Sequence, residues 1–352
     1  MTHVLGAPGL RHAEAASAPQ AGEGKLSGPA SQISVSVFAP AKINLFLHVG
    51  ERRDDGYHAL ESLIAFAEVG DRLTLLRARE ISLSIGGRFG GALSSGPDNL
   101  VIKAAHALLT SPPSGERSRV ASPRAGEGAM LPPAQIGAAI TLEKNLPVAS
   151  GIGGGSADAA AALRGLNALW NLRYSEGELL NIAEQLGSDV PACLLSRPCW
   201  MEGRGERVTP LAPLPQFPLI LINPGVMVPT GPVFGSLNAR TGLGAKAPIG
   251  EIKSVWDLVG YLDGAVNDLE APASRLAPDI EDALSALDRE PGCVLAQMSG
   301  SGATCFGLFD QQQFAIGAAE RIAQDHPEWW VKLTRIAAAD IGAPEQRSAE
   351  NQ

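Results

Sequence analysis

The clearest run of residues that could do chemistry is Leu146-Pro-Val-Ala-Ser-Gly-Ile-Gly-Gly-Gly-Ser-Ala-Asp158, in which four of the five positions 151–155 are glycine. An Ala-rich helical pattern follows directly. Glycine lets backbone N–H groups approach an anion closely, and a helix N-terminus adds a favourable dipole. The run therefore predicts a phosphate-binding loop, with a flexible strand-to-helix turn as the alternative. It lacks both the lysine of a Walker A loop and the third glycine of the dinucleotide fingerprint.

Two charged residues occupy positions that call for an explanation. Lys42 lies within an apolar strand pattern, where an unpaired ammonium is costly, so it must face a partner or a cleft. Asp189 follows the helix terminator Gly187 and precedes Pro191, a position where a carboxylate is exposed to a cleft. Phosphoryl transfer to an alcohol needs a proton acceptor and positive charge beside the γ-phosphate, and these residues fit. The alternatives are a helix cap for Asp189 and a solvated edge-strand lysine for Lys42.

The glycine-rich run resembles the ATP loop of the GHMP kinases, the family named for galactokinase, homoserine kinase, mevalonate kinase and phosphomevalonate kinase. The matching residues are Pro147-x-x-x-Gly151-Ile-Gly-Gly-Gly-Ser-Ala157, and Ala149 stands where the family often has glycine. Near the C-terminus, Met298-Ser-Gly-Ser-Gly-Ala303 resembles the third glycine-rich motif of the family. By this resemblance, ATP binds along Pro147, Val148, Ala149, Ser150, Gly151, Ile152, Gly153, Gly154, Gly155, Ser156 and Ala157.

Three further blocks resemble one branch of this family, which phosphorylates 4-diphosphocytidyl-2-C-methyl-D-erythritol. They run from Ala39 to Leu47, from Arg53 to His58 and from Gly187 to Pro191. The resemblance covers about residues 33 to 337, with 111–134 standing outside it as an insertion. It implies transfer of the γ-phosphoryl group of ATP to the substrate 2-hydroxyl, in non-mevalonate isoprenoid precursor synthesis, with Mg²⁺ accompanying ATP.

The resemblance also implies a role for individual side chains. Asp189 would be the catalytic base, and Lys42 would contact both Asp189 and the substrate hydroxyl. Asn44 would hydrogen-bond the erythritol portion of the substrate, with a purely structural amide as the alternative. Ser156 would bind Mg²⁺ or a β-phosphate, or would only cap its helix.

A pocket for the nucleobase is implied as well. Tyr57 would stack on cytosine and His58 would hydrogen-bond its polar edge, which is a common way to hold an unpaired base. Phe234 would be the second aromatic wall, or an ordinary core residue. Mevalonate and homoserine fit this pocket less well as acceptors, because neither carries a base. A non-catalytic nucleotide or sugar sensor on the same fold would be expected to lose Lys42 or Asp189, and both are present.

The mixture of strands and helices predicts an α+β fold, and the resemblance implies the two-domain GHMP kinase fold. Its N-terminal domain, like domain 2 of ribosomal protein S5, would span 33–196, and its ferredoxin-like C-terminal domain would span 197–343. Disorder is predicted from composition at 1–32, at 111–134 and in a tail at 344–352.

The strand that carries Lys42 and Asn44 is predicted to place both side chains on one face. Its other face would hold Ile43, Leu45, Leu47 and Val49. The other predicted strands are 71–76, 81–85, 136–142, 218–223, 293–298 and 303–309. Helices are predicted at Asn99–Leu109 with Asp98 as N-cap, from Ser156, from Ser175 to Gly187, at 275–288 and at 311–325, and a loop is predicted at 239–252.

Composition narrows the class of partner. The chain has 352 residues and a formal net charge of −9, which disfavours nucleic acid. No run reaches the ~18 to 20 apolar residues of a membrane span, and the four cysteines form no C-x-x-C pair. No secretory pattern opens the chain. We therefore expect a cytoplasmic protein with no evident nucleic-acid, membrane or protein partner, and the resemblance implies a small-molecule substrate.

Overall fold

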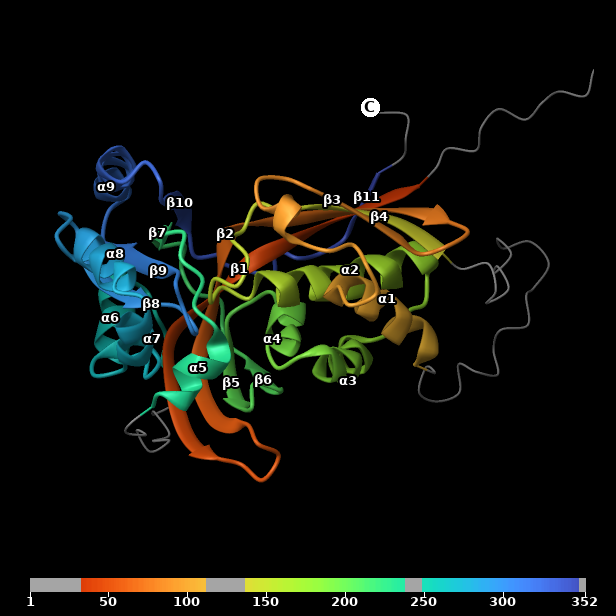
Figure 1. Ribbon diagram of the computed structural model, residues 1–352, viewed down its shortest axis with the longest axis horizontal. Helices are drawn as coiled ribbons and strands as arrows, with labels where there is room; N and C mark the ends of the chain where they lie inside the picture. The colour runs from red at the N-terminus through yellow and green to blue at the C-terminus, as the bar shows by residue number, and fades with distance from the viewer. Residues whose placement is uncertain (1–32, 112–136, 238–248, 348–352) are drawn as a thin grey trace, which may run out of the picture. The chain divides into compact units, whose positions relative to one another are not determined.

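The computed structural model describes residues 33–111, 137–237 and 249–347. Within these residues the strands form one sheet of seven and a second sheet of four (Figure 1). The larger sheet contains β1 (Ser34–Arg52), β2 (His58–Ala78), β3 (Ser82–Gly86), β4 (Gly137–Glu143), β5 (Cys199–Gly203), β6 (Arg207–Pro210) and β11 (Glu345–Arg347). The smaller sheet contains β7 (Pro218–Asn223), β8 (Cys293–Met298), β9 (Cys305–Phe309) and β10 (Trp330–Arg335).

The larger sheet has the strand order β11-β1-β2-β4-β3, and β5 joins it by pairing with β2. The smaller sheet has the order β10-β7-β9-β8. All of the pairings are antiparallel except that of β3 with β4. The helices are α1 (Leu100–Thr110), α2 (Gly154–Trp170), α3 (Glu176–Leu186), α4 (Val190–Leu195), α5 (Thr230–Gly235), α6 (Val255–Leu262), α7 (Glu270–Leu276), α8 (Asp279–Asp288) and α9 (Gln312–Asp325).

Helix α2 lies against β1 and β2 on one face of the larger sheet, and α1, α3 and α4 pack around it (Figure 1). Its small side chains allow this close approach. A Cβ at Gly165 would lie 2.7 Å from the Leu75 side chain and 2.8 Å from that of Val37. This packing fixes the helix N-terminus, and with it the glycine-rich loop, beside the middle of β1.

A β-bulge changes the predicted faces of β1. The pairing register with β2 shifts between Asn44 and Phe46, which leaves Leu45 without a partner on β2. Before the bulge Ile43 packs in one core cluster, whereas Leu47 beyond it packs in the other. The prediction of a single apolar face for all four residues is therefore wrong, because an extra residue in one strand shifts its alternation by one.

Several element boundaries also differ from prediction. The N-cap of α1 is Asn99, whose side chain accepts from the Val101 N–H, and not Asp98. The helix predicted at 275–288 is two helices, α7 and α8, and Pro278 stands at the N-cap of the second. The tail predicted to be disordered from 344 pairs with β1 as far as Arg347.

Other boundaries agree with prediction. The capping box of Ser175 and Glu178 opens α3, and Gly187 ends it. The domain limits stay a prediction, although β5 and β6 follow residue 196 and still join the larger sheet. The segments predicted as disordered at 1–32 and 112–134, and 239–248 of the predicted loop, lie outside the described residues. Among the helices that the structure describes, none has the length and apolar character needed to cross a membrane.

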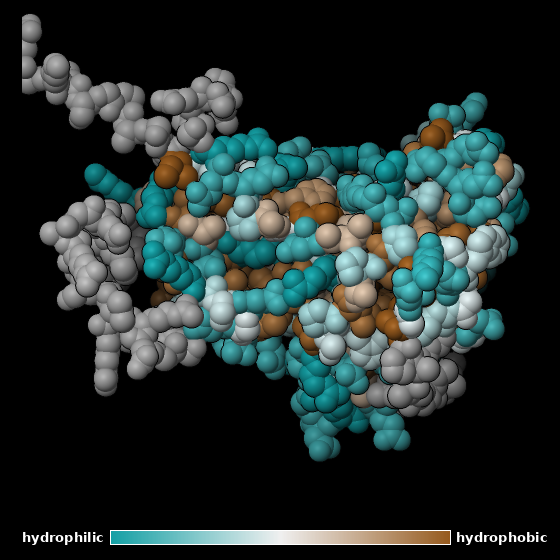
Figure 2. Space-filling model, turned by 180° about the vertical axis from the view of Figure 1, so that it is seen from behind, coloured by the Kyte–Doolittle hydropathy of each residue, from teal (hydrophilic) through white to brown (hydrophobic). Residues whose placement is uncertain are grey.

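The turn between β1 and β2 projects from the sheet (Figure 1). Its side chains at Arg53, Asp54 and Asp55 are exposed, and the projection is hydrophilic when seen from behind (Figure 2). Gly56 has a φ of +85°, which residues other than glycine rarely adopt. The Arg53 N–H donates to the Tyr57 carbonyl at 2.7 Å and closes the turn. The turn therefore holds Tyr57 at a fixed position outside the sheet.

Candidate active site

The glycine-rich loop connects β4 to α2 in a conformation that depends on left-handed residues. Gly151 has a φ of +77° and Gly153, the N-cap of α2, has a φ of +64°. Ala149 also lies in the left-handed region, with a φ of +52°. A Cβ at Gly151 would lie 2.3 Å from the Ser299 carbonyl oxygen, so only glycine fits there. The first N–H groups of α2 have no acceptor within the helix and can serve an anion.

The loop is fastened to the strand that carries Lys42. The Lys42 N–H donates to the Ile152 carbonyl at 3.0 Å. Beside it, a Cβ at Gly153 would lie 3.1 Å from Lys42 Cε, which is closer than ordinary contact. The Lys42 ammonium and the N-terminus of α2 therefore face the same space.

Lys42 and Asp189 form an ion pair next to this loop. Lys42 Nζ lies 3.2 Å from Asp189 Oδ1, and the lysine side chain is only 3% exposed whereas that of Asp189 is 39% exposed. The alternative of a solvated lysine is therefore wrong. Asp189 stands at the N-cap of α4, yet within the described chain its side chain makes no capping hydrogen bond. Its carboxylate is held by the ammonium and is open to solvent on its other side.

Asn44 is used within the protein. Its Oδ1 accepts from Lys42 Nζ at 2.8 Å, and its Nδ2 donates to Ser62 Oγ at 2.8 Å. The Ser62 hydroxyl donates in turn to the Phe46 carbonyl. Asn44 is 1% exposed, and through these contacts its amide orients the Lys42 ammonium. Its contact with the erythritol portion of the substrate stays a prediction. Ser62 was not predicted from the sequence, although a serine within an apolar strand pattern indicates a buried hydrogen bond.

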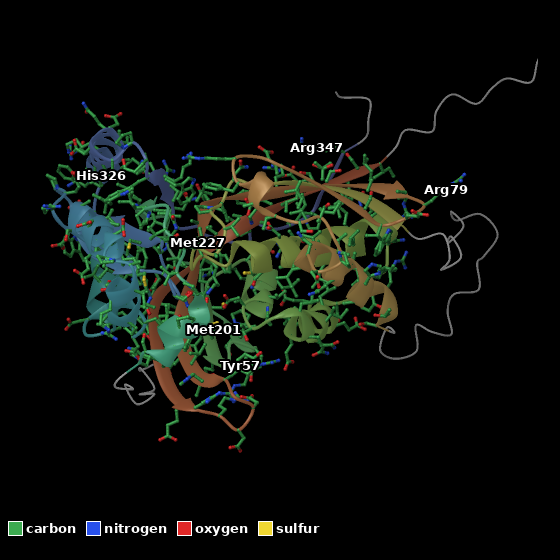
Figure 3. All side chains as sticks on the ribbon, viewed as in Figure 1. Tyr57, Arg79, Met201, Met227, His326 and Arg347 are labelled. Carbon is green, nitrogen blue, oxygen red and sulfur yellow. The ribbon has the colours of Figure 1, made fainter. Side chains whose placement is uncertain are left out.

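Of the residues predicted for the nucleobase pocket, His58 and Phe234 contact each other, and Tyr57 lies at the projecting turn, where Figure 3 labels it. The rings of His58 and Phe234 lie 5.5 Å apart at 30°, and His58 Nδ1 lies 3.2 Å from the Gly50 carbonyl. Tyr57 is 52% exposed, and the Arg204 guanidinium lies 5.5 Å from its ring centroid. Arg204 was not predicted, because it comes from the β5–β6 turn.

A buried cluster of charges supports the start of the loop. Lys144 Nζ pairs with Asp71 Oδ2 at 2.5 Å and with Asp158 Oδ2 at 2.6 Å. The other Asp71 oxygen accepts from the N–H groups of Asn145 and Leu146. Burial raises the pKa of Asp158 to about 7, with the Asp71 carboxylate acting in the same direction and Lys144 against it. Sequence reasoning did not find this cluster, because its three members come from separate elements.

Ser156 lies in the first turn of α2 and is partly buried. The helix begins at Gly154 with Gly153 as its N-cap, so Ser156 is not the cap residue. Across the residues that the structure describes, no group of three or more His, Cys, Asp or Glu could hold a metal ion.

The chain matches two models of one protein family. The family described as GHMP kinases N terminal domain matches residues 120–197, and the one described as GHMP kinases C terminal matches residues 254–327. A crystal structure of homoserine kinase from Cytophaga hutchinsonii has a TM-score of 0.59 at 19% identity, covering 89% of this chain and 97% of that one, and so shares the fold. The predicted α+β, two-domain GHMP kinase fold is confirmed.

Nearer relatives narrow the family. A protein of Parvibaculum lavamentivorans named 4-diphosphocytidyl-2-C-methyl-D-erythritol kinase is 46% identical over 311 residues, which are 88% of this chain and 99% of that protein. A crystal structure of 4-(cytidine 5'-diphospho)-2C-methyl-D-erythritol kinase has a TM-score of 0.63 at 33% identity and covers 86% of this chain and 99% of its own. The chain belongs to the 4-diphosphocytidyl-2-C-methyl-D-erythritol kinase family.

Proposed function

We propose that this chain transfers the γ-phosphoryl group of ATP to the 2-hydroxyl of 4-diphosphocytidyl-2-C-methyl-D-erythritol. The products are ADP and the 2-phosphate, and the reaction belongs to non-mevalonate isoprenoid precursor synthesis. The observation that carries the proposal is the Lys42–Asp189 ion pair, 3.2 Å long, beside a glycine-rich loop that opens a helix. It provides a proton acceptor, a buried cation and an anion site in one place.

The transfer needs each of these groups in a separate role. The solvent-open carboxylate of Asp189 takes the proton of the substrate hydroxyl. The oxygen of that hydroxyl bonds to the γ-phosphorus, and the bond from the γ-phosphorus to the bridging oxygen of ADP breaks. Lys42 is held in place by Asn44 at 2.8 Å, so its charge is already oriented toward the oxygens that become more negative.

The backbone of residues 147–157 is proposed to bind the phosphates of ATP through its N–H groups. The site offers one candidate ligand for Mg²⁺. The Ser156 hydroxyl lies in the first turn of α2, and it is not used as the cap of that helix. Mg²⁺ commonly keeps several waters and takes few protein ligands beside the phosphates. When bound, it would neutralise charge on the β- and γ-phosphate oxygens, with Ser156 as its candidate ligand.

Tyr57, His58 and Phe234 are proposed to hold the cytosine. The half-exposed Tyr57 ring is available for stacking, with Arg204 against it, and the aromatic pair of His58 and Phe234 adds a second surface. Stacking on aromatic rings is tolerant of base type, so the edge of the base must be read by a hydrogen bond from His58. We also keep the contact of Asn44 with the erythritol portion as a proposal.

Two alternatives are less well supported. Mevalonate and homoserine carry no base, so they leave the aromatic pocket unexplained. A non-catalytic sensor has no need of the paired Lys42 and Asp189. A cytoplasmic location and a small-molecule substrate, with no nucleic-acid, membrane or protein partner, remain our expectation from the sequence.

A coupled ADP-release assay across the three alcohols tests the proposal. Purified protein with ATP and Mg²⁺ is expected to turn over the cytidine diphosphate substrate. With mevalonate or homoserine, the rate of ADP release should not exceed the rate measured with ATP and no alcohol. Equal turnover with mevalonate would overturn the assignment of the substrate, and ADP release that needs no alcohol would overturn the kinase assignment.

A further inference from the structure

The hydroxyl of Ser299 lies between β1, the strand that carries Lys42, and the glycine-rich loop. Ser299 is fully buried in the turn between β8 and β9. Its Oγ accepts a hydrogen bond from the Asn44 N–H at 3.1 Å and donates one to the Gly151 carbonyl at 3.3 Å. One side chain therefore joins the backbone beside Lys42 to the backbone of the phosphate-binding loop.

This bridge lies near a direct contact between the same two elements. The Lys42 N–H donates to the Ile152 carbonyl at 3.0 Å, one residue along the loop and two residues along the strand from the Ser299 bridge. The Ser299 hydroxyl is thus a second attachment between β1 and the loop. A further bond, from the Thr304 N–H to the Ser150 carbonyl at 3.1 Å, holds the loop to the β8–β9 connection and does not involve β1.

The turn that carries Ser299 is itself held rigidly. Asn267 Nδ2 donates to the carbonyls of Met298 and Gly300, at 2.7 and 2.8 Å. The turn also packs against the loop with no spare space, because a Cβ at Gly300 would lie 2.4 Å from the Gly151 carbonyl oxygen. The hydroxyl therefore has a fixed position from which to set the loop.

We propose that Ser299 is a positioning residue for phosphoryl transfer, which orients the ATP loop relative to Lys42 and Asn44. The inference rests on the proposed function, in which the γ-phosphate lies on the loop and the acceptor hydroxyl lies at Lys42. In-line transfer requires these reactants to be aligned, and a misplacement of about 1 Å can cost ~100-fold in rate. Without the hydroxyl, the Asn44 N–H and the Gly151 carbonyl lose their buried partner, and β1 can shift relative to the loop, which stays bonded to the β8–β9 connection through Thr304.

The test compares Ser299→Ala with Ser299→Thr, which restores a hydroxyl, and with a matched control. The control is Thr304→Val, which removes another fully buried hydroxyl a few residues away. Thr304 Oγ1 accepts from Asn223 Nδ2 of β7 at 3.0 Å. The Thr304 N–H donates to the Ser150 carbonyl of the loop at 3.1 Å, and this backbone bond is kept in Thr304→Val. For each protein, kcat, the KM of both substrates and the melting temperature are measured.

We expect Ser299→Ala to lower kcat roughly 10- to 100-fold with the KM of each substrate within about 3-fold of the parent. Ser299→Thr should recover most of the loss, and Thr304→Val should keep kcat near the parent at a comparable melting temperature. The inference is overturned if kcat of Ser299→Ala stays near the parent, if threonine fails to rescue it, or if both hydroxyl deletions lower kcat equally. The parent in the same assay tests the proposed function separately, because only that function's failure would leave the parent inactive on the cytidine substrate.

Discussion

Replacing Asp189 with asparagine removes one charge and one proton acceptor while keeping the shape of the side chain. The structural cost falls on Lys42, whose side chain is only 3% exposed, because its ammonium loses the opposite charge while keeping its contact with Asn44 at 2.8 Å. An exposed ion pair contributes about 0 to 1 kcal/mol, whereas removing one partner of a fully buried pair costs about 3 to 5 kcal/mol. The Asp189 side chain is 39% exposed and makes no capping bond to α4 within the described chain, so we expect a cost between these limits, of about 1 to 2 kcal/mol. The melting temperature should therefore fall by several degrees, at about 2–4 °C per kcal/mol.

The catalytic cost should be much larger. An amide cannot take the proton of the substrate hydroxyl, and a positioned general base is typically worth ~10²- to 10⁴-fold in rate. That range corresponds to about 3 to 5 kcal/mol in the activation barrier. The ratio of the two costs separates a catalytic carboxylate from a structural one, since a structural role would cost stability and rate together.

The assay is ADP release with both substrates saturating, together with thermal unfolding of the same samples. Asp325→Asn, an equal change of charge at an exposed residue of α9, is the control and should behave as the parent. A kcat for Asp189→Asn within about 3-fold of the parent would refute the role of the base. A loss of rate accompanied by loss of the folded protein would assign Asp189 to structure.

Three further substitutions have distinct expected results. Lys42→Met should lower kcat with little change in the KM for ATP, since the loop binds phosphates through its backbone; steady-state kinetics would contradict this if KM alone rose. Tyr57→Ala should raise the KM of the cytidine substrate about 5- to 150-fold, because a lost base stack is worth about 1–3 kcal/mol, and a parallel rise for ATP would instead indicate a folding defect. Asp158→Asn concerns stability. The native pKa of about 7 exceeds the ordinary 3.8, so the native state holds a proton that the unfolded state releases, and the parent's unfolding free energy falls as pH rises through that window. Urea unfolding should therefore show that the unfolding free energy of Asp158→Asn, relative to that of the parent, is higher at pH 7.5 than at pH 5. A difference between the two proteins that does not change with pH would exclude the raised pKa of Asp158 as its cause.

Features set by neighbouring residues could be predicted from the sequence. The capping box at Ser175 and Glu178 and the glycine-rich loop depend on contacts within a few positions, and both lie where the sequence placed them. The bulge at Leu45 could not be predicted, because strand alternation says nothing about the register of the partner strand.

The inner part of the site depends on long-range packing. Lys144 meets Asp71 and Asp158 only when β2, β4 and α2 have assembled, and no spacing in the sequence indicates that cluster. The same holds for Ser299, whose hydroxyl reaches Asn44 across 255 positions. The family resemblance predicts the contact between Lys42 and Asp189. The burial of the lysine and the exposure of the carboxylate depend on the fold and could not be predicted.

The position of the transferred phosphate tests the central claim most directly. Carbon 2 of the methylerythritol portion bears a methyl group and no hydrogen, so a phosphate ester on its hydroxyl has no proton three bonds from phosphorus. After complete turnover, a proton-coupled phosphorus NMR spectrum should contain one new phosphate monoester singlet, in equal amount to the ADP formed. A doublet or a triplet, from transfer to the secondary or primary hydroxyl, or ADP without any new ester, would contradict the proposed reaction.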